Sequence, residues 1–196
     1  WLYDCVRIIQ EKRERYGEVD LGKGMKVNVE FVSANPTGPL HMGNARGGAL
    51  GDCLASVLKK AGYDVTKEFY INDAGNQIEK FGMSLEARYL QLVLGEDKVE
   101  FPEDGYHGED IIEHAKAYFS QHGDSLMDKP SEERRRILVD YALPINIQRI
   151  RDILSAYGIE YDVWFPEKTL HDNGDVKRVV DYLTEKGYTL EKDGAI

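Results

Sequence analysis

The chain has 196 residues, of which 42% are hydrophobic and 10% aromatic, and its formal net charge is −10 at pH 7. This length and apolar content are enough for one domain with a substantial core. The acidic balance excludes a broad, non-specific nucleic-acid binder, because such a protein needs a basic surface to contact phosphates. No run of residues resembles a membrane span or a secretory leader, so we expect a cytoplasmic location and no membrane partner. We also expect a monomer.

Residues 1–24 begin with apolar side chains spaced among Arg and Glu, a pattern that predicts an amphipathic helix ending near Gly17. Residue 1 is Trp rather than Met, so we expect the chain to be part of a longer protein.

The next segment, residues 27–31, predicts a strand because Val27, Val29 and Phe31 alternate with other residues. Glu30 is charged, whereas a central parallel strand typically has apolar residues on both faces. Two interpretations of Glu30 remain open. Its carboxylate is either solvated on an exposed strand, or it lines a pocket that accepts a cationic ligand.

A rigid loop and a long helix follow this strand. Pro36 and Pro39 fix their own φ angles, while Gly38 lets the backbone pass close to a ligand. Helical spacing of apolar residues then predicts a helix from about residue 40 to residue 61. We expect its Cys53 to be a buried free thiol in a reducing compartment, and we expect Gly47, Gly48 and Gly51 to allow close packing on the sheet.

The first turn of this helix carries His41, Gly43 and Asn44. A helix N-terminus offers free N–H groups and the positive end of the helix dipole, so it suits phosphate. A capping or surface role is the common explanation for a lone His at such a place. After a strand and a Gly/Pro loop, we favour His41 and Asn44 as donors to phosphate, with Gly43 leaving space for a nucleotide.

A second strand is predicted at residues 64–71 and a helix at residues 75–94, which makes a parallel strand–helix–strand unit. Asn72 and Asp73 stand at the carboxyl end of the second strand. Ligands of doubly wound sheets bind outside the carboxyl ends of strands, so we expect these residues on the same rim as residues 30–44. Asp73 either caps the following helix or contacts substrate or an RNA end.

The segment from residue 95 to residue 157 differs in character and is predicted to be an acidic helical insertion. Residues 96–140 hold 13 acidic and 6 basic residues. We expect helices at residues 109–122, 131–142 and 145–157, with Pro144 interrupting the last two. The run Arg134, Arg135 and Arg136 is interpreted as a solvated turn paired with neighbouring acids such as Glu132, Glu133 and Asp140, rather than as an RNA contact.

Residues 158–196 are predicted to return to the sheet. A strand is expected at residues 159–165 and a helix at residues 173–187, with Val176, Val179, Val180 and Leu183 facing inward. A hairpin is expected around residues 192–194. The His residues are scattered and form no ligand pattern, so we expect no bound metal.

Residues 29–46 resemble the nucleotide-binding signature of class I aminoacyl-tRNA synthetases, specifically the arginyl-tRNA synthetases of the bacterial type. His41-Met42-Gly43-Asn44 matches the "HIGH" motif of that class, with Asn in place of the final His. Residues 70–78 give a second match. The resemblance implies an α/β fold with a Rossmann-like parallel sheet, in which residues 25–94 start the catalytic domain and the chain spans its N-terminal half. It also implies that residues 1–24 are a linker helix from a preceding domain.

The resemblance also implies the chemistry: ATP with Mg²⁺ activates L-arginine to arginyl adenylate, and the arginyl group then moves to the 3′ end of tRNA(Arg). No match to a second, lysine-rich nucleotide motif occurs, so we expect these residues alone to be inactive. Two alternatives are a small nucleotidylyl transferase and a non-catalytic interaction module.

The resemblance also implies roles for individual residues. Catalysis is implied for His41 and Asn44, and ATP binding for Thr37, Gly38, His41, Gly43 and Asn44. Arginine binding is implied for Glu30, Ser33 and Asn35, and contact with substrate or the tRNA end for Asn72, Asp73 and Gln77.

Overall fold

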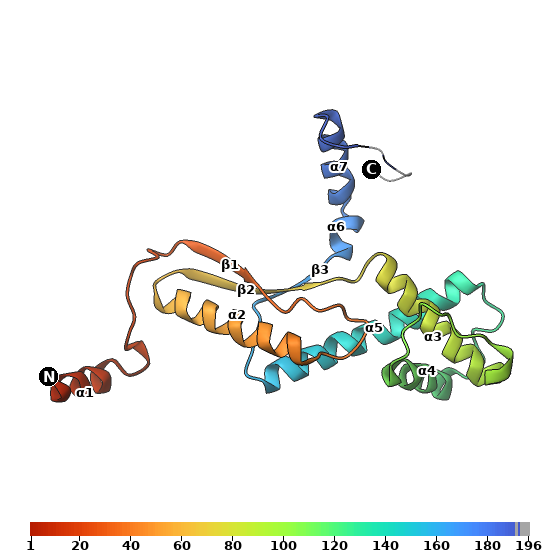
Figure 1. Cartoon of the computed structure of the whole chain (residues 1–196), viewed down its shortest axis with the longest axis horizontal. Coiled ribbons are helices and arrows are strands. Elements are labelled where there is room, and N and C mark those ends of the chain that lie inside the picture. Colours follow the sequence, from red (N-terminus) through yellow and green to blue (C-terminus); the bar gives the residue numbers. More distant parts are fainter. Residues whose placement is uncertain (191, 193–196) are drawn as a thin grey trace. The chain divides into compact units, whose positions relative to one another are not determined.

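The computed structural model describes residues 1–190 and 192, and Figure 1 labels its α-helices and β-strands. The chain divides into two compact units. Unit 1 comprises Trp1–Ser33, His41–Phe69 and Leu154–Trp164, and unit 2 comprises Ala34–Leu40, Tyr70–Ile153 and Phe165–Ile196. In chain order the elements are α1 (Leu2–Lys12), η1 (Arg13–Arg15), β1 (Lys26–Glu30), α2 (Met42–Lys60), β2 (Asp64–Ile71), α3 (Asn76–Leu94), η2 (Glu96–Lys98), α4 (Glu109–His122), α5 (Ser131–Ala156), β3 (Val163–Pro166), α6 (Lys168–Asp172) and α7 (Asp175–Glu185).

The sheet has the strand order β1–β2–β3, and β1 pairs with β2 in parallel, from Lys26 opposite Asp64 to Glu30 opposite Glu68. The predicted α/β fold with a parallel sheet is therefore confirmed. Strand β3 begins at Val163, later than the alternating pattern from Ile159 indicated. Ile159 is buried and packs against Gly48, so that part of the pattern reflects contact with a helix rather than sheet pairing.

Helix α2 packs in unit 1 through small residues, and Gly48, Gly51 and Ala55 are its buried positions. A Cβ atom at Gly51 would lie 2.2 Å from Cγ of Phe31 at the end of β1. The close packing predicted for the glycines is thus confirmed for Gly48 and Gly51, whereas a Cβ at Gly47 would have nothing within 4 Å. The buried thiol predicted for Cys53 is wrong, because Cys53 lies away from this small-residue face and is exposed.

We expect Gly51→Ala to lower the melting temperature of the intact protein and Gly47→Ala to raise it slightly. The new methyl group at position 51 would overlap the Phe31 ring, and overpacking of this kind costs about 1–3 kcal/mol. At position 47 the space is open, so Ala brings only its better helix propensity, worth up to about 1 kcal/mol. Thermal unfolding of both variants checks this, and a Gly51→Ala protein as stable as the parent would contradict the packing described.

Unit 2 is built around helices α3, α4 and α5, whose side chains share one core. Tyr89 of α3 is fully buried, donates its hydroxyl to the Gly123 carbonyl at 2.9 Å and accepts from Leu126 N–H at 3.2 Å. The buried members of this core are Phe81, Leu85, Tyr89, Ile111, Ala115, Tyr118, Leu126, Leu138 and Ala142.

Helix α5 runs without a break from Ser131 to Ala156, so the predicted interruption at Pro144 is wrong. Proline removes the N–H that would bond to the carbonyl of residue 140, but Asp140 is exposed and water can satisfy that carbonyl. Ala142 and Asn146, on either side of Pro144, are both buried. Continuous burial along one face outweighs the local cost of the proline.

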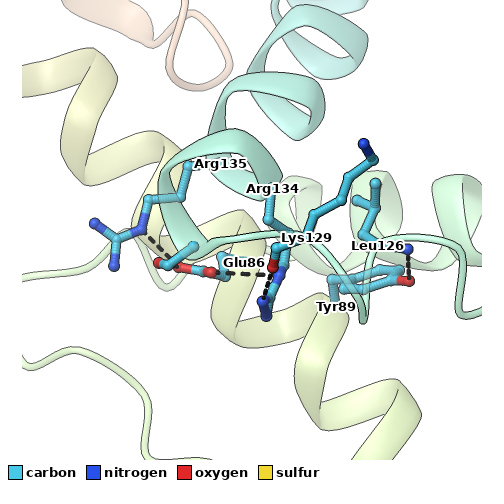
Figure 2. Close-up of polar contacts among 7 residues, drawn as sticks. Glu86, Tyr89, Leu126, Lys129, Arg134 and Arg135 are labelled. Atoms are coloured by element: carbon cyan, nitrogen blue, oxygen red, sulfur yellow. Dashed lines mark hydrogen bonds and ion pairs between the residues drawn. The ribbon is translucent and has the colours of Figure 1, made fainter.

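Glu86 of α3 forms the ionic centre of unit 2 (Figure 2). Its buried carboxylate lies 2.6 Å from Nε of Arg135 and 3.6 Å from Nε of Arg134, and it accepts from the Ser131 hydroxyl at 2.9 Å. Arg134 also donates to the Lys129 carbonyl at 2.8 Å. Arg134 and Arg135 thus pair with a buried acid on another helix, so the predicted pairing with Glu132, Glu133 and Asp140 is wrong for these two arginines. It agrees with the structure for Arg136, because hydrogen bonding to Lys129 lowers the pKa of Glu133 and the charge of Arg136 adds to this effect.

The C-terminal part of unit 2 differs from its prediction. Helix α7 forms within the predicted range, but Val176, Val179, Val180 and Leu183 are 36–51% exposed rather than facing inward. No element among the described residues covers this amphipathic face. The short helix α6 was not predicted, and the expected hairpin lies largely outside the described residues. Among residues 1–190 and 192, no helix is long and apolar enough to cross a membrane.

Candidate nucleotide and amino-acid site

In unit 1, the carboxyl end of β1 carries Glu30 and Ser33. Glu30 is the last residue of the strand, and its side chain is exposed. Val32 and Ser33 then take positive φ angles of 67° and 42°, a conformation that is strongly disfavoured for a β-branched residue. Such strain is concentrated at ligand-binding positions, and here it turns the chain sharply after the strand.

The strand end is held by Tyr161, whose hydroxyl donates to the Phe31 carbonyl at 3.0 Å. Burial, with a smaller contribution from the nearby Asp52 carboxylate, raises the pKa of Tyr161 above its ordinary value. The phenol therefore remains a protonated donor over the whole physiological range. This contact fixes the backbone between Glu30 and the strained residues.

His41 and Asn44 form a reciprocal cap at the start of α2. Nδ1 of His41 accepts from Gly43 N–H at 3.1 Å, and Oδ1 of Asn44 accepts from His41 N–H at 2.9 Å. Because Nδ1 accepts, a neutral His41 carries its proton on Nε2. The capping contacts leave Nε2–H of His41 and the Nδ2 amide of Asn44 available as donors. The capping interpretation of His41 is therefore confirmed, and its role as a donor to phosphate stays a prediction.

In unit 2, the loop Ala34–Leu40 contributes Asn35, Thr37 and Gly38. Nδ2 of Asn35 donates to Oε1 of Gln77 at 2.9 Å, and the Tyr106 hydroxyl donates to the same oxygen at 2.9 Å. The Asn72 side chain approaches Oδ1 of Asn35 to 3.1 Å. Three of the predicted residues, Asn35, Asn72 and Gln77, are thus brought together, and Thr37 is buried in the loop at 6% exposure.

Asp73 does not cap α3, which was one of the two roles expected for it, and its contact with substrate or an RNA end stays a prediction. Its Oδ1 accepts from the Lys168 backbone N–H at 2.8 Å, at the first residue of α6, whereas the N-cap of α3 is Gly75. Asp73 therefore caps α6. The prediction that it caps the following helix is wrong because two further residues lie between Asp73 and the first turn of α3.

Tyr106 was missed by the sequence analysis, since a single tyrosine in a polar loop carries no pattern that marks it. Its contact with Gln77 appears only when the loop before α4 folds against α3. Within the described residues, no group of three or more His, Cys, Asp or Glu side chains is arranged to hold a metal ion.

Several known proteins are similar to this chain over its whole length. An "Arginine--tRNA ligase" of Acetivibrio thermocellus is 70% identical over 196 residues, and one of Ruminiclostridium cellulolyticum is 62% identical. The chain is fully covered in both matches but spans only about a third of these relatives, 35% of each.

Two solved structures are also similar to this chain. A crystal structure described as an arginyl-tRNA synthetase from Campylobacter jejuni matches with a TM-score of 0.80 at 31% identity, covering 97% of this chain and 41% of that one. The arginyl-tRNA synthetase of Thermus thermophilus matches with a TM-score of 0.52 at 26% identity, covering 88% of this chain and 29% of that one. The family model described as "tRNA synthetases class I (R), catalytic domain" matches residues 6–196. With the parallel sheet and the capped His-Met-Gly-Asn turn, this shows that the chain belongs to the catalytic-domain family of the class I (R) tRNA synthetases.

Proposed function

We propose that this chain supplies the amino-acid and nucleotide sites for the first half of an arginine–tRNA ligase reaction. The observation that carries the proposal is the reciprocal cap at α2, which leaves the Nε2–H of His41 and the Nδ2 amide of Asn44 as donors at a helix N-terminus. The names of its relatives, arginine–tRNA ligases with 70% and 62% identity, support the same assignment.

In this proposal the phosphates of ATP, accompanied by Mg²⁺, bind at the start of α2. His41 and Asn44 donate to the phosphate oxygens, and Gly43 leaves room for the nucleotide. Gly38 contributes backbone in the preceding loop, while the buried Thr37 supports that loop from within. The helix dipole adds a favourable field for the negative charge. The phosphates carry that charge through the reaction, so donors fixed in advance stabilise the transition state.

L-arginine is proposed to bind near the end of β1. The Glu30 carboxylate would accept a bidentate pair of hydrogen bonds from the guanidinium group. Ser33 and Asn35 would hold the α-amino end, with Asn35 oriented by Gln77 and Tyr106. A site that satisfies all the donors of a guanidinium discriminates strongly against lysine, because the wrong ligand leaves buried groups unpaired.

The reaction needs no covalent intermediate on the protein. The arginine carboxylate attacks the α-phosphorus of ATP, pyrophosphate leaves, and a hydroxyl of the terminal tRNA adenosine then displaces AMP from the arginyl adenylate. The protein's contribution is positioning and charge stabilisation. Asn72, Asp73 and Gln77 are proposed to shape this site or receive the tRNA end. All these residues come from one chain, so a monomer suffices, and the free Cys5 and Cys53 fit a reducing cytoplasm.

Incubating the intact protein with labelled L-arginine, Mg-ATP and total tRNA tests the proposal. We expect label to become attached to RNA, with no attachment when ATP is left out and none when labelled L-lysine replaces arginine. Consumption of ATP without labelling of RNA would favour a small nucleotidylyl transferase. Absence of both would favour a non-catalytic module.

A further inference from the structure

A buried polar pair in unit 2 touches the loop that carries the proposed substrate residues. His114 of α4 is 3% exposed and Asn146 of α5 is 4% exposed. Nε2 of His114 lies 2.7 Å from Oδ1 of Asn146, and Nδ2 of Asn146 donates to the Pro36 carbonyl at 3.0 Å. The two helices of the acidic segment therefore reach the loop Ala34–Leu40 through a continuous hydrogen-bonded chain.

The proton positions in this chain follow from its acceptors. The Pro36 carbonyl can only accept, so Asn146 must present its amide nitrogen there and its oxygen to His114. His114 must then carry a proton on Nε2. Each group has one arrangement that satisfies its partner, and buried hydrogen bonds of this kind are costly to leave unmade.

The hydrogen bond from Asn146 holds the backbone of Pro36, the residue next to Asn35. Pro36 is fully buried, and the loop Ala34–Leu40 belongs to unit 2, although β1 before it and α2 after it belong to unit 1. Asn35 is further fixed through Gln77 and Tyr106. Within unit 2, hydrogen bonds thus hold both the Pro36 backbone and the Asn35 side chain.

We propose that His114 and Asn146 are positioning residues that hold the loop Ala34–Leu40 in the conformation needed for L-arginine and ATP. The inference rests on the proposed function for its kinetic consequence only; the restraint on the loop is independent of it. The helical segment between α3 and β3 would then act on substrate binding indirectly, through this loop.

Four variants of the intact protein test this. Asn146→Leu keeps the size of the side chain but removes both hydrogen bonds, and His114→Leu removes the donor to Asn146. His114→Gln can place an amide N–H near the position of Nε2 of His114, so it serves as the conservative variant. Leu138→Ala is the matched control, because Leu138 is 1% exposed in the same helix and belongs to the core of unit 2. All measurements are made well below the melting temperature of each variant.

The first readout is hydrogen exchange of the peptide spanning residues 33–44. We expect exchange to be about tenfold faster in Asn146→Leu, because the loop loses its hydrogen bond to Asn146. A similar increase is expected in His114→Leu, because the Asn146 amide is no longer oriented by its partner, and no change is expected in His114→Gln and Leu138→Ala. The second readout is arginylation of tRNA, where kcat/KM for arginine should fall about a hundredfold in the two Leu variants and stay near the parent value in the other two.

Unchanged exchange in Asn146→Leu, or equal acceleration in Leu138→Ala, would overturn the inference. Accelerated exchange with unchanged kcat/KM in an active parent would overturn its kinetic part. A parent protein that attaches no arginine refutes the proposed function instead, and the exchange readout still decides whether the pair restrains the loop.

Discussion

Replacing Glu30 by Gln in the intact protein is expected to raise KM for L-arginine by a factor of about 100 to 1,000 while leaving KM for ATP within about threefold. Losing one member of a desolvated charge pair costs about 2–5 kcal/mol. The Gln side chain is neutral and offers the guanidinium one acceptor oxygen in place of two. Glu30 stands at the end of β1, and no ion pair to it is found among the described residues, so its carboxylate is available to a ligand.

Glu68 is the matched control for this prediction. It lies opposite Glu30 on β2 in the parallel register, and its carboxylate accepts from the Asn28 amide at 3.2 Å. The same Glu-to-Gln change there should leave KM for arginine unaltered. Equal losses for arginine and ATP in Glu30→Gln, or no loss for either, would contradict the assignment of Glu30 to the guanidinium.

His41→Ala is expected to lower kcat for arginylation by a factor of about 100 to 1,000, with little change in KM for arginine. Removing one preorganised donor from a developing negative charge costs this much in comparable sites. The same change removes the cap of α2, which costs about 1 kcal/mol of stability. The measurement therefore pairs turnover with the melting temperature.

The variant His41→Asn separates the two roles. Asn is an excellent N-cap, so it should restore the melting temperature, but its short side chain cannot place a donor where Nε2 lies. We expect turnover to remain as low as in His41→Ala. Recovery of kcat together with stability would mean that His41 acts on the reaction only through the cap.

The local pattern of the sequence predicted much of the fold. Strand β2 and helix α4 have the predicted bounds, and β1 and α3 differ by a residue or two at their ends. The sequences of these elements have a clear periodicity and clear signals for their ends, such as the Gly that follows α4. Pro144 misled the prediction because its local cost is visible in the sequence, whereas the burial of Ala142 and Asn146 on either side is not.

For the candidate site, the sequence analysis proposed residues but could not predict the contacts between them. The His-Met-Gly-Asn turn was identified at the start of α2. The sequence could not show that Nδ1 of His41 accepts the capping hydrogen bond and leaves Nε2–H as a donor. Asp73 caps α6 because the chain returns to it 95 residues later. The same kind of distant contact joins Asn146 to Pro36, 110 residues apart. Local patterns do not record such pairs.

The most direct test of the central claim is calorimetric titration of the intact protein with L-arginine and, separately, with L-lysine. Saturable heat with arginine and none with lysine at the same concentrations is the predicted result, because the site is proposed to satisfy a guanidinium group through Glu30. Equal heats with the two amino acids, or no heat with arginine, would contradict the proposal that these residues form an arginine-selective site.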